Sequence, residues 1–228
     1  MNKRMAMFKA SYLQLRIYLL GVVGFVLAGL LANVIVFLSI GGDDNTQVSF
    51  MNQMVICLIF VGSVLPAAFF KKIINVGATR QEYYSGLLMI YAIWAAAASL
   101  LNIAWWRLEI GVIRDYEDTF NIIEIFHWDQ FGALGAFVYQ FGVYMLLMSL
   151  LTLLFSGLRH AAGWTIWVIL VAAIPVGTSV PSLRPKVADF FLTLLYNDSL
   201  WQGFGLTIVL SAGFLAGGWW FTSRRTFA

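Results

Sequence analysis

The stretch GLLMIYAIWAAAASLLNIAWW, residues 86–106, runs for 21 residues without a charged side chain. A helix needs about 20 apolar residues to cross the hydrocarbon core of a bilayer. The stretch ends on Trp105 and Trp106, whose amphipathic rings prefer the headgroup level of a membrane. The sequence therefore predicts that this segment spans a membrane as a helix.

Five more apolar blocks resemble it, at about residues 17–40, 51–70, 131–156, 163–180 and 203–222. The chain of 228 residues is 61% hydrophobic and 11% charged, whereas soluble domains are roughly 45–50% apolar and about 25% charged. The first block is too long for the apolar core of a signal peptide, and Pro175 is expected to bend or end the fifth span. We predict an all-α polytopic membrane protein with six transmembrane helices in a single domain, residues 17–228.

The charged residues all fall between these blocks and are segregated by side. Six spans place both termini on one side, so the connectors alternate between two sets. One set carries ten basic residues and one acidic residue, a net charge of +9. The other carries four basic and ten acidic residues, a net charge of −6. The positive-inside rule then predicts that both termini are cytoplasmic.

Three connectors have patterns of their own. Residues 1–16 form an amphipathic arm that either lies on the cytoplasmic leaflet as a short helix or merely flanks the first span. Residues 107–130 form an outer acidic loop, which either attracts a cationic ligand or is a solvated face. Residues 186–197 have the spacing of a short amphipathic helix at the outer interface.

The cytoplasmic connector between the second and third spans, residues 71–86, is the most informative. Gly77 is suited to a left-handed helix end, and Thr79 and Glu82 have the spacing of a capping box, which starts a new helix. The connector is therefore expected to be a helix, a sharp break and another helix. Such an element is either an ordinary capped turn or a rigid protrusion that transmits force.

The residues Gly77, Thr79, Arg80, Tyr83 and Gly86 carry a resemblance to a known family. Together with Tyr84, they resemble the G-x-[ST]-R-x-x-[FY] segment of bacterial ABC-2-type ABC transporter permeases. That family places its cytoplasmic coupling helix between the second and third of six spans. The resemblance implies coupling to an ATPase subunit through Asn75, Gly77, Thr79, Arg80, Glu82, Tyr83 and Tyr84.

The same resemblance implies the setting in which the chain works. It would be a permease of the bacterial plasma membrane, joined by a second permease copy or paralogue into a twelve-span dimer. ATP and Mg²⁺ would bind in the separate ATPase subunit, so no cofactor is expected on this chain. Membrane lipids are expected partners, and nucleic acid is not.

Motifs for chemistry within the chain itself are missing. No G-x-x-x-x-G-K-[ST], H-E-x-x-H or G-x-S-x-G pattern occurs, so we expect no ATPase site and no enzyme activity. No metal site is expected, since His127 among acidic residues is more often a solvated group than a ligand. The apolar blocks contain polar but no ionisable side chains, which argues against proton-driven transport.

The amide side chains within or beside the spans have two interpretations. They either line a transport pathway or form hydrogen bonds between helices, which is the commoner use. The candidates for lining a pathway are Asn33, Asn52, Gln53, Asn102 and Gln140.

Together with this resemblance, the sequence favours the membrane-spanning permease of an ATP-driven ABC transporter. The resemblance implies export, and the substrate would be hydrophobic or amphipathic, such as a peptide, a lipid-like molecule or a drug. The alternative is a non-transporting membrane scaffold or immunity factor that binds a partner through its outer acidic loop.

Overall fold

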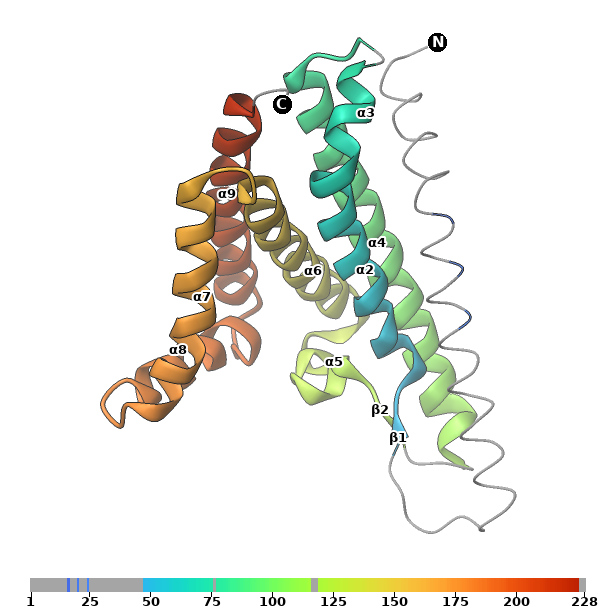
Figure 1. Ribbon diagram of the computed structural model, residues 1–228. Helices are drawn as coiled ribbons and strands as arrows, with labels where there is room; N and C mark the ends of the chain where they lie inside the picture. The colour runs from blue at the N-terminus through green and yellow to red at the C-terminus, as the bar shows by residue number, and fades with distance from the viewer. Residues whose placement is uncertain are drawn as a thin grey trace.

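The computed structural model describes residues 47–75, 77–115 and 119–225, with the single positions Arg16, Leu20 and Gly24. Helices dominate the described part, which Figure 1 shows as a bundle. The helices are α2 (Met54–Val64), α3 (Phe70–Asn75), α4 (Arg80–Gly111), α5 (Ile122–Ile125), α6 (Gly132–Gly157), α7 (Ala161–Ser179), α8 (Arg184–Leu195) and α9 (Leu200–Arg224). The strands β1 (Gln47–Val48) and β2 (Thr119–Phe120) pair in parallel.

Shorter helical turns complete the described chain. A π-turn, Leu65–Phe69, joins α2 to α3. The 3₁₀ turns are Phe50–Gln53, Ile113–Asp115 and Trp128–Phe131.

Five helical segments of the described chain are long and apolar enough to cross a membrane: Phe50–Asn75, Arg80–Gly111, Trp128–Gly157, Ala161–Ser179 and Leu200–Arg224. They coincide with five of the six predicted blocks and confirm an all-α protein of polytopic membrane type. The predicted first span, the arm at residues 1–16 and Asn33 lie outside the described residues, apart from the three single positions.

Helix α4 extends beyond its apolar block, which corrects two predictions. Helix α4 includes Arg107 and Glu109, so the predicted acidic loop at 107–130 begins inside a helix, and not every charged residue lies between the spans. Within the fifth block, helix α7 continues through Pro175 to Ser179, so Pro175 does not end the helix, and the alternative that it bends the helix stays a prediction. Backbone hydrogen bonding carries a helix past the apolar residues, because it does not depend on which side chains face lipid.

Helix α6 occupies the centre of the bundle, with α2 and α4 on one side and α7 and α9 on the other (Figure 1). Its contact with α9 is close because glycines line it. A Cβ atom on Gly142 would lie 2.5 Å from Oγ1 of Thr207, and one on Gly203 would lie 2.1 Å from the hydroxyl of Tyr139. Small residues of this kind allow transmembrane helices to approach one another.

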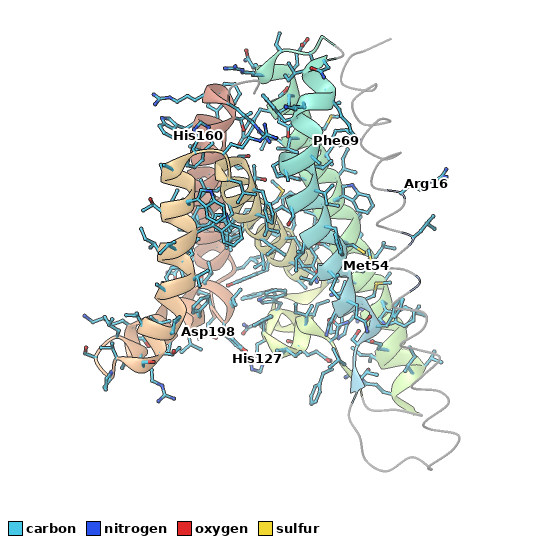
Figure 2. All side chains as sticks on the ribbon, viewed as in Figure 1. Arg16, Met54, Phe69, His127, His160 and Asp198 are labelled. Atoms are coloured by element: carbon cyan, nitrogen blue, oxygen red, sulfur yellow. The ribbon has the colours of Figure 1, made fainter. Side chains whose placement is uncertain are left out.

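The two ends of the bundle differ in charge. At the basic end lie the break between α3 and α4, the turn between α6 and α7, and the end of α9 (Figure 1). At the acidic end lie α5, α8 and the two strands. Figure 2 shows Phe69 and His160 towards the basic end, and His127 and Asp198 towards the acidic end. Within the described residues these connectors and the end of α9 lie at the same end of the bundle, and the side of the membrane that they face stays a prediction.

The break between α3 and α4, residues 73–82, is called the elbow below. Gly77 has a φ of 90°, its N–H donates to the carbonyl of Ile74 over 2.9 Å, and the N–H of Ala78 donates to Ile73 over 3.4 Å. This pair of bonds is a Schellman helix end. Thr79 and Glu82 then form the predicted capping box at the start of α4, so the helix–break–helix prediction is confirmed.

Replacing Gly77 with alanine is expected to lower the free energy of unfolding by about 1 kcal/mol, because a side chain disfavours positive φ. A Cβ atom there has open space around it, as it does at Gly213 inside α9. Gly213→Ala is therefore the matched control and should be neutral or stabilising. Titration with a denaturing detergent measures both, and an equal effect of the two substitutions would show that backbone conformation does not govern the elbow.

Candidate functional site: the elbow and its buried contacts

The guanidinium group of Arg80, in the first turn of α4, binds the end of α9. It donates one hydrogen bond to the carbonyl of Ser223 and another, of 3.0 Å, to the carbonyl of Arg225. The last carbonyls of a helix have no partner within the helix, and a cation there also complements the helix dipole. Arg80 thus joins the elbow to the C-terminal end of the bundle.

The π-turn joining α2 to α3 contains Pro66, which has no N–H to donate. Residues far away in the sequence donate hydrogen bonds to the carbonyls of this turn. The hydroxyl of Tyr83 donates to the carbonyl of Leu65 over 3.0 Å. Arg225 donates to the carbonyls of Pro66 and Ala67 over 2.8 and 3.1 Å. A side chain of α4 and one that follows α9 therefore hold the same turn.

Arg225 is only 4% exposed, which is unusual for an arginine. Its guanidinium carbon lies 4.8 Å from the ring centroid of Phe70, a cation–π contact. Burial lowers the pKa of Arg225, and the positive charge of Arg159 lowers it further. The carbonyls of the π-turn and the Phe70 ring offset part of the cost of burying this charge.

Tyr84 ties α4 to α9 a second time. Its hydroxyl donates to the carbonyl of Leu215, and its ring centroid lies 5.2 Å from that of Trp219. Of the predicted coupling residues, Arg80, Tyr83 and Tyr84 thus bind other helices of the same chain. Asn75, Gly77 and Thr79 are exposed, and Glu82 is half-buried in the capping box.

Two of the amides predicted as pathway candidates, Asn52 and Asn102, form hydrogen bonds towards the acidic end. Asn52 donates to the carbonyl of Phe120 and accepts from the N–H of Ile122, both over 2.9 Å. Asn102 and Asn121 exchange hydrogen bonds of 3.0 and 3.3 Å. These contacts attach the segment after β2 to the first two described spans, which is the structural use of such amides.

Glu109 belongs to the same buried cluster and is 1% exposed. Its carboxylate accepts from the indole of Trp105 over 2.7 Å and from the amide of Asn121 over 3.0 Å. Asn121 also donates to the hydroxyl of Ser49 over 3.2 Å. The sequence assigned Glu109 to the outer loop, whereas the structure buries its carboxyl group near the end of α4.

The two remaining described candidates for lining a pathway, Gln53 and Gln140, each have a buried amide oxygen. Gln140, inside α6, donates to the hydroxyl of Tyr144 over 2.8 Å. Oε1 atoms of both Gln140 and Gln53 are buried without a hydrogen-bond partner among the described residues. Whether any of these amides lines a pathway stays a prediction.

The acidic end is closed by a packed cap around α5. The indole of Trp128 donates to the carbonyl of Leu195 over 2.8 Å, and the hydroxyl of Tyr139 donates to Leu194 over 2.9 Å, so both bind the end of α8. Arg114 pairs with Glu124; partial burial alone would raise the pKa of Glu124, but its bond with Arg114 holds that pKa below the ordinary value. The predicted acidic loop is therefore largely ordered and packed in its described part.

The predicted outer helix at residues 186–197 is α8, which spans Arg184–Leu195. Its side chains Phe190 and Phe191 are about half exposed, at 46% and 51%, while Leu194 is buried. The exposed aromatic pair suits a helix lying at a membrane interface. Among the described residues no group of three or more His, Cys, Asp or Glu side chains is arranged to hold a metal ion.

Three residues of these sites were not predicted from the sequence: Arg225, Asn121 and Pro66. Pro66 carried a usable signal, because a proline in the middle of an apolar block disturbs helix hydrogen bonding. Arg225 was counted only as a charge for topology, and Asn121 stood in a loop. Their roles depend on neighbours more than a dozen residues away, which periodicity does not reveal.

The chain matches no protein-family model, no curated protein and no solved structure. The function proposed below therefore depends on the geometry of the chain and on the resemblance of residues 75–86.

Proposed function

We propose that this chain is the membrane-spanning subunit of an ATP-driven transporter of the ABC-2 type, worked through the elbow by a separate ATPase subunit. The observation that supports the proposal is the attachment of the elbow to the rest of the bundle. Arg80 binds the end of α9, Tyr83 binds the π-turn, and Arg225 binds that same turn from beyond α9. A displacement of the elbow is thereby passed to three spans.

The exposed part of the elbow is small and polar. Asn75, Gly77, Thr79 and Gln81 are exposed, and the Schellman end and the capping box fix the backbone between them. A fixed backbone transmits a push from a docked subunit, whereas a loop without such bonds would absorb it. ATP and Mg²⁺ would act in the docked subunit, and this chain would supply the moving spans.

The remaining features of the proposal follow the family resemblance. The chain would pair with a second permease copy or paralogue in the bacterial plasma membrane. It would export a hydrophobic or amphipathic substrate, a peptide, a lipid-like molecule or a drug. Cytoplasmic placement of the basic end is part of the proposal and follows from the positive-inside rule.

A bulky residue on the exposed elbow is expected to abolish association with the ATPase subunit. Gln81→Trp places an indole where a docked subunit would lie, and Gln130→Trp places one on an exposed position of the acidic end as the control. The tagged chain is purified from its native host, and the ATPase activity of the eluate is measured. Activity is expected with the wild type and with Gln130→Trp and should fall at least about tenfold with Gln81→Trp.

Equal ATPase activity in both variants, or none with the wild type, would contradict the proposal. Absence of an associated ATPase from a chain that still produces its cellular phenotype would instead favour the membrane scaffold or immunity factor. That second candidate is favoured by the ordered cap at the acidic end, where Trp128 and Ile123 are fully buried and support a fixed outer surface.

The orientation is tested with single cysteines. The only cysteine of the chain, Cys57, is 3% exposed and gives little background labelling. With an impermeant maleimide on intact cells, Gln130→Cys is expected to react and Gln81→Cys to stay unlabelled until the membrane is permeabilised. Labelling of Gln81→Cys on intact cells would place the elbow outside and remove the transporter proposal.

A further inference from the structure

The turn between α6 and α7 presents two residues, Arg159 and His160, at the basic end. The backbones of Gly157 and Gly163, one on each side of the turn, lie close to each other. A Cβ atom on Gly163 would be only 2.0 Å from the carbonyl oxygen of Gly157. The N–H of His160 donates to that carbonyl over 2.9 Å. The turn is therefore tight and holds its two polar residues in a fixed place.

The end of α9 lies beside this turn. The imidazole ring of His160 has its centroid 5.4 Å from that of Phe221 and 6.3 Å from that of Trp220. The guanidinium carbon of Arg224 lies 4.3 Å from the centroid of Trp220. Arg159 and Arg224 are both exposed, and they lie in the two segments that the ring contacts of His160 join.

This cluster has no counter-ion in its own segments. Residues 157–164 and 218–225 contain no aspartate or glutamate, and the charge of Arg159 acts unfavourably on Arg225. The Nε2 atom of His160 is buried with no hydrogen-bond partner among the described residues. Two arginines and an imidazole without a partner suit an anion with several acceptor oxygens, above all a phosphate.

The cluster lies at a level that suits a lipid headgroup. Trp164 is 58% exposed and Trp220 is 42% exposed, and exposed tryptophans mark the interface between hydrocarbon and water. Figure 1 shows the elbow projecting beyond the turn between α6 and α7 at the same end of the molecule. A docked protein would meet the elbow first, whereas the turn is set back towards the membrane.

We infer that Arg159, His160 and Arg224 bind the phosphate group of an anionic phospholipid, with Trp164 and Trp220 beside its glycerol backbone and acyl chains. Basic sites at the ends of transmembrane helices recognise headgroups in this way. The assignment of this site to the cytoplasmic leaflet rests on the proposed orientation, whereas the existence of the site does not.

Binding is measured on the purified chain in nanodiscs of phosphatidylcholine with and without phosphatidylglycerol, by native mass spectrometry and by the melting temperature. Phosphatidylglycerol is expected to stay bound and to raise the melting temperature of the wild type. Arg159→Gln/Arg224→Gln should weaken its binding at least about tenfold. The matched control Arg184→Gln/Lys186→Gln removes two exposed cations at the acidic end and should change it little.

Equal melting temperatures of all variants in phosphatidylcholine alone would show that each is folded, and Arg159→Lys/Arg224→Lys should restore part of the binding. Equal retention of phosphatidylglycerol by the glutamine variant and its control would overturn the inference. The inference would also be overturned if inorganic phosphate displaced phosphatidylglycerol fully, or raised the melting temperature as much as phosphatidylglycerol does. Either result would show a site for free phosphate. None of these results depends on the ATPase subunit, so the proposed function is tested separately.

Discussion

Replacing Arg225 with alanine is expected to lower the free energy of unfolding by about 3 kcal/mol. The substitution leaves the carbonyls of Pro66 and Ala67 without the bonds that Arg225 donates. It also empties the space beside the ring of Phe70. Carbonyls freed inside a wide helical turn are costly, because Pro66 already removes one internal hydrogen bond there. Titration with a denaturing detergent gives the measurement.

The neighbouring Arg224 provides the matched control. It carries the same charge and is exposed, and its guanidinium carbon lies over the ring of Trp220. Arg224→Ala should therefore cost about 0.5 kcal/mol or less. Arg225→Lys should lie between the two alanine variants, because an ammonium group lacks the planar fork that reaches two carbonyls. Similar losses for Arg224→Ala and Arg225→Ala would mean that the π-turn does not need its arginine.

Replacing Asn121 with alanine is expected to cost about 3 kcal/mol at the other end of the bundle. Asn121 is 0% exposed and caps the N–H of Ile123 over 3.1 Å. Without the amide of Asn121, Asn102 loses the partner with which it exchanges two hydrogen bonds. The carboxylate of Glu109 loses the amide donor and keeps its bond from the indole of Trp105. A buried carboxylate that loses a donor raises the energy of the folded state directly.

Asn197 offers the comparison, since its amide bonds Thr193 and Ser199 near the end of α8 in a less buried place. Asn197→Ala should cost about 1 kcal/mol. A double substitution with Glu109→Gln then tests the buried contact, and a coupling of roughly 1 kcal/mol or more is expected between positions 109 and 121. Independent, additive effects would show that the buried polar cluster does not act as a unit.

The helices were predictable because each depends on local composition. An apolar block of about 20 residues can hardly be anything but a span, and five blocks appear as helices in the described chain. The elbow was predictable too, since Gly77, Thr79 and Glu82 carry their turn chemistry in the sequence itself.

The contacts of the elbow were not predictable from local pattern. Arg225 and Pro66 are 159 positions apart, and Arg80 reaches Ser223 across 143 positions. The charge of Arg225 fitted the positive-inside rule equally well whether the side chain pointed to water or into the bundle. Glu109 was placed in a loop because hydropathy ends a span where the apolar residues end, although the helix continues.

The π-turn between α2 and α3 has a consequence for any rearrangement of this bundle. A π-turn holds one residue more than an α-helical turn, and that surplus can migrate along a helix and rotate everything beyond it. Here the side chains of Tyr83, in α4, and of Arg225, just beyond α9, bind the carbonyls of this turn. Rotation of α3 about its axis would require the hydrogen bonds of Tyr83 and of Arg225 to break together. Such a rotation would therefore be a two-state change without a stable intermediate.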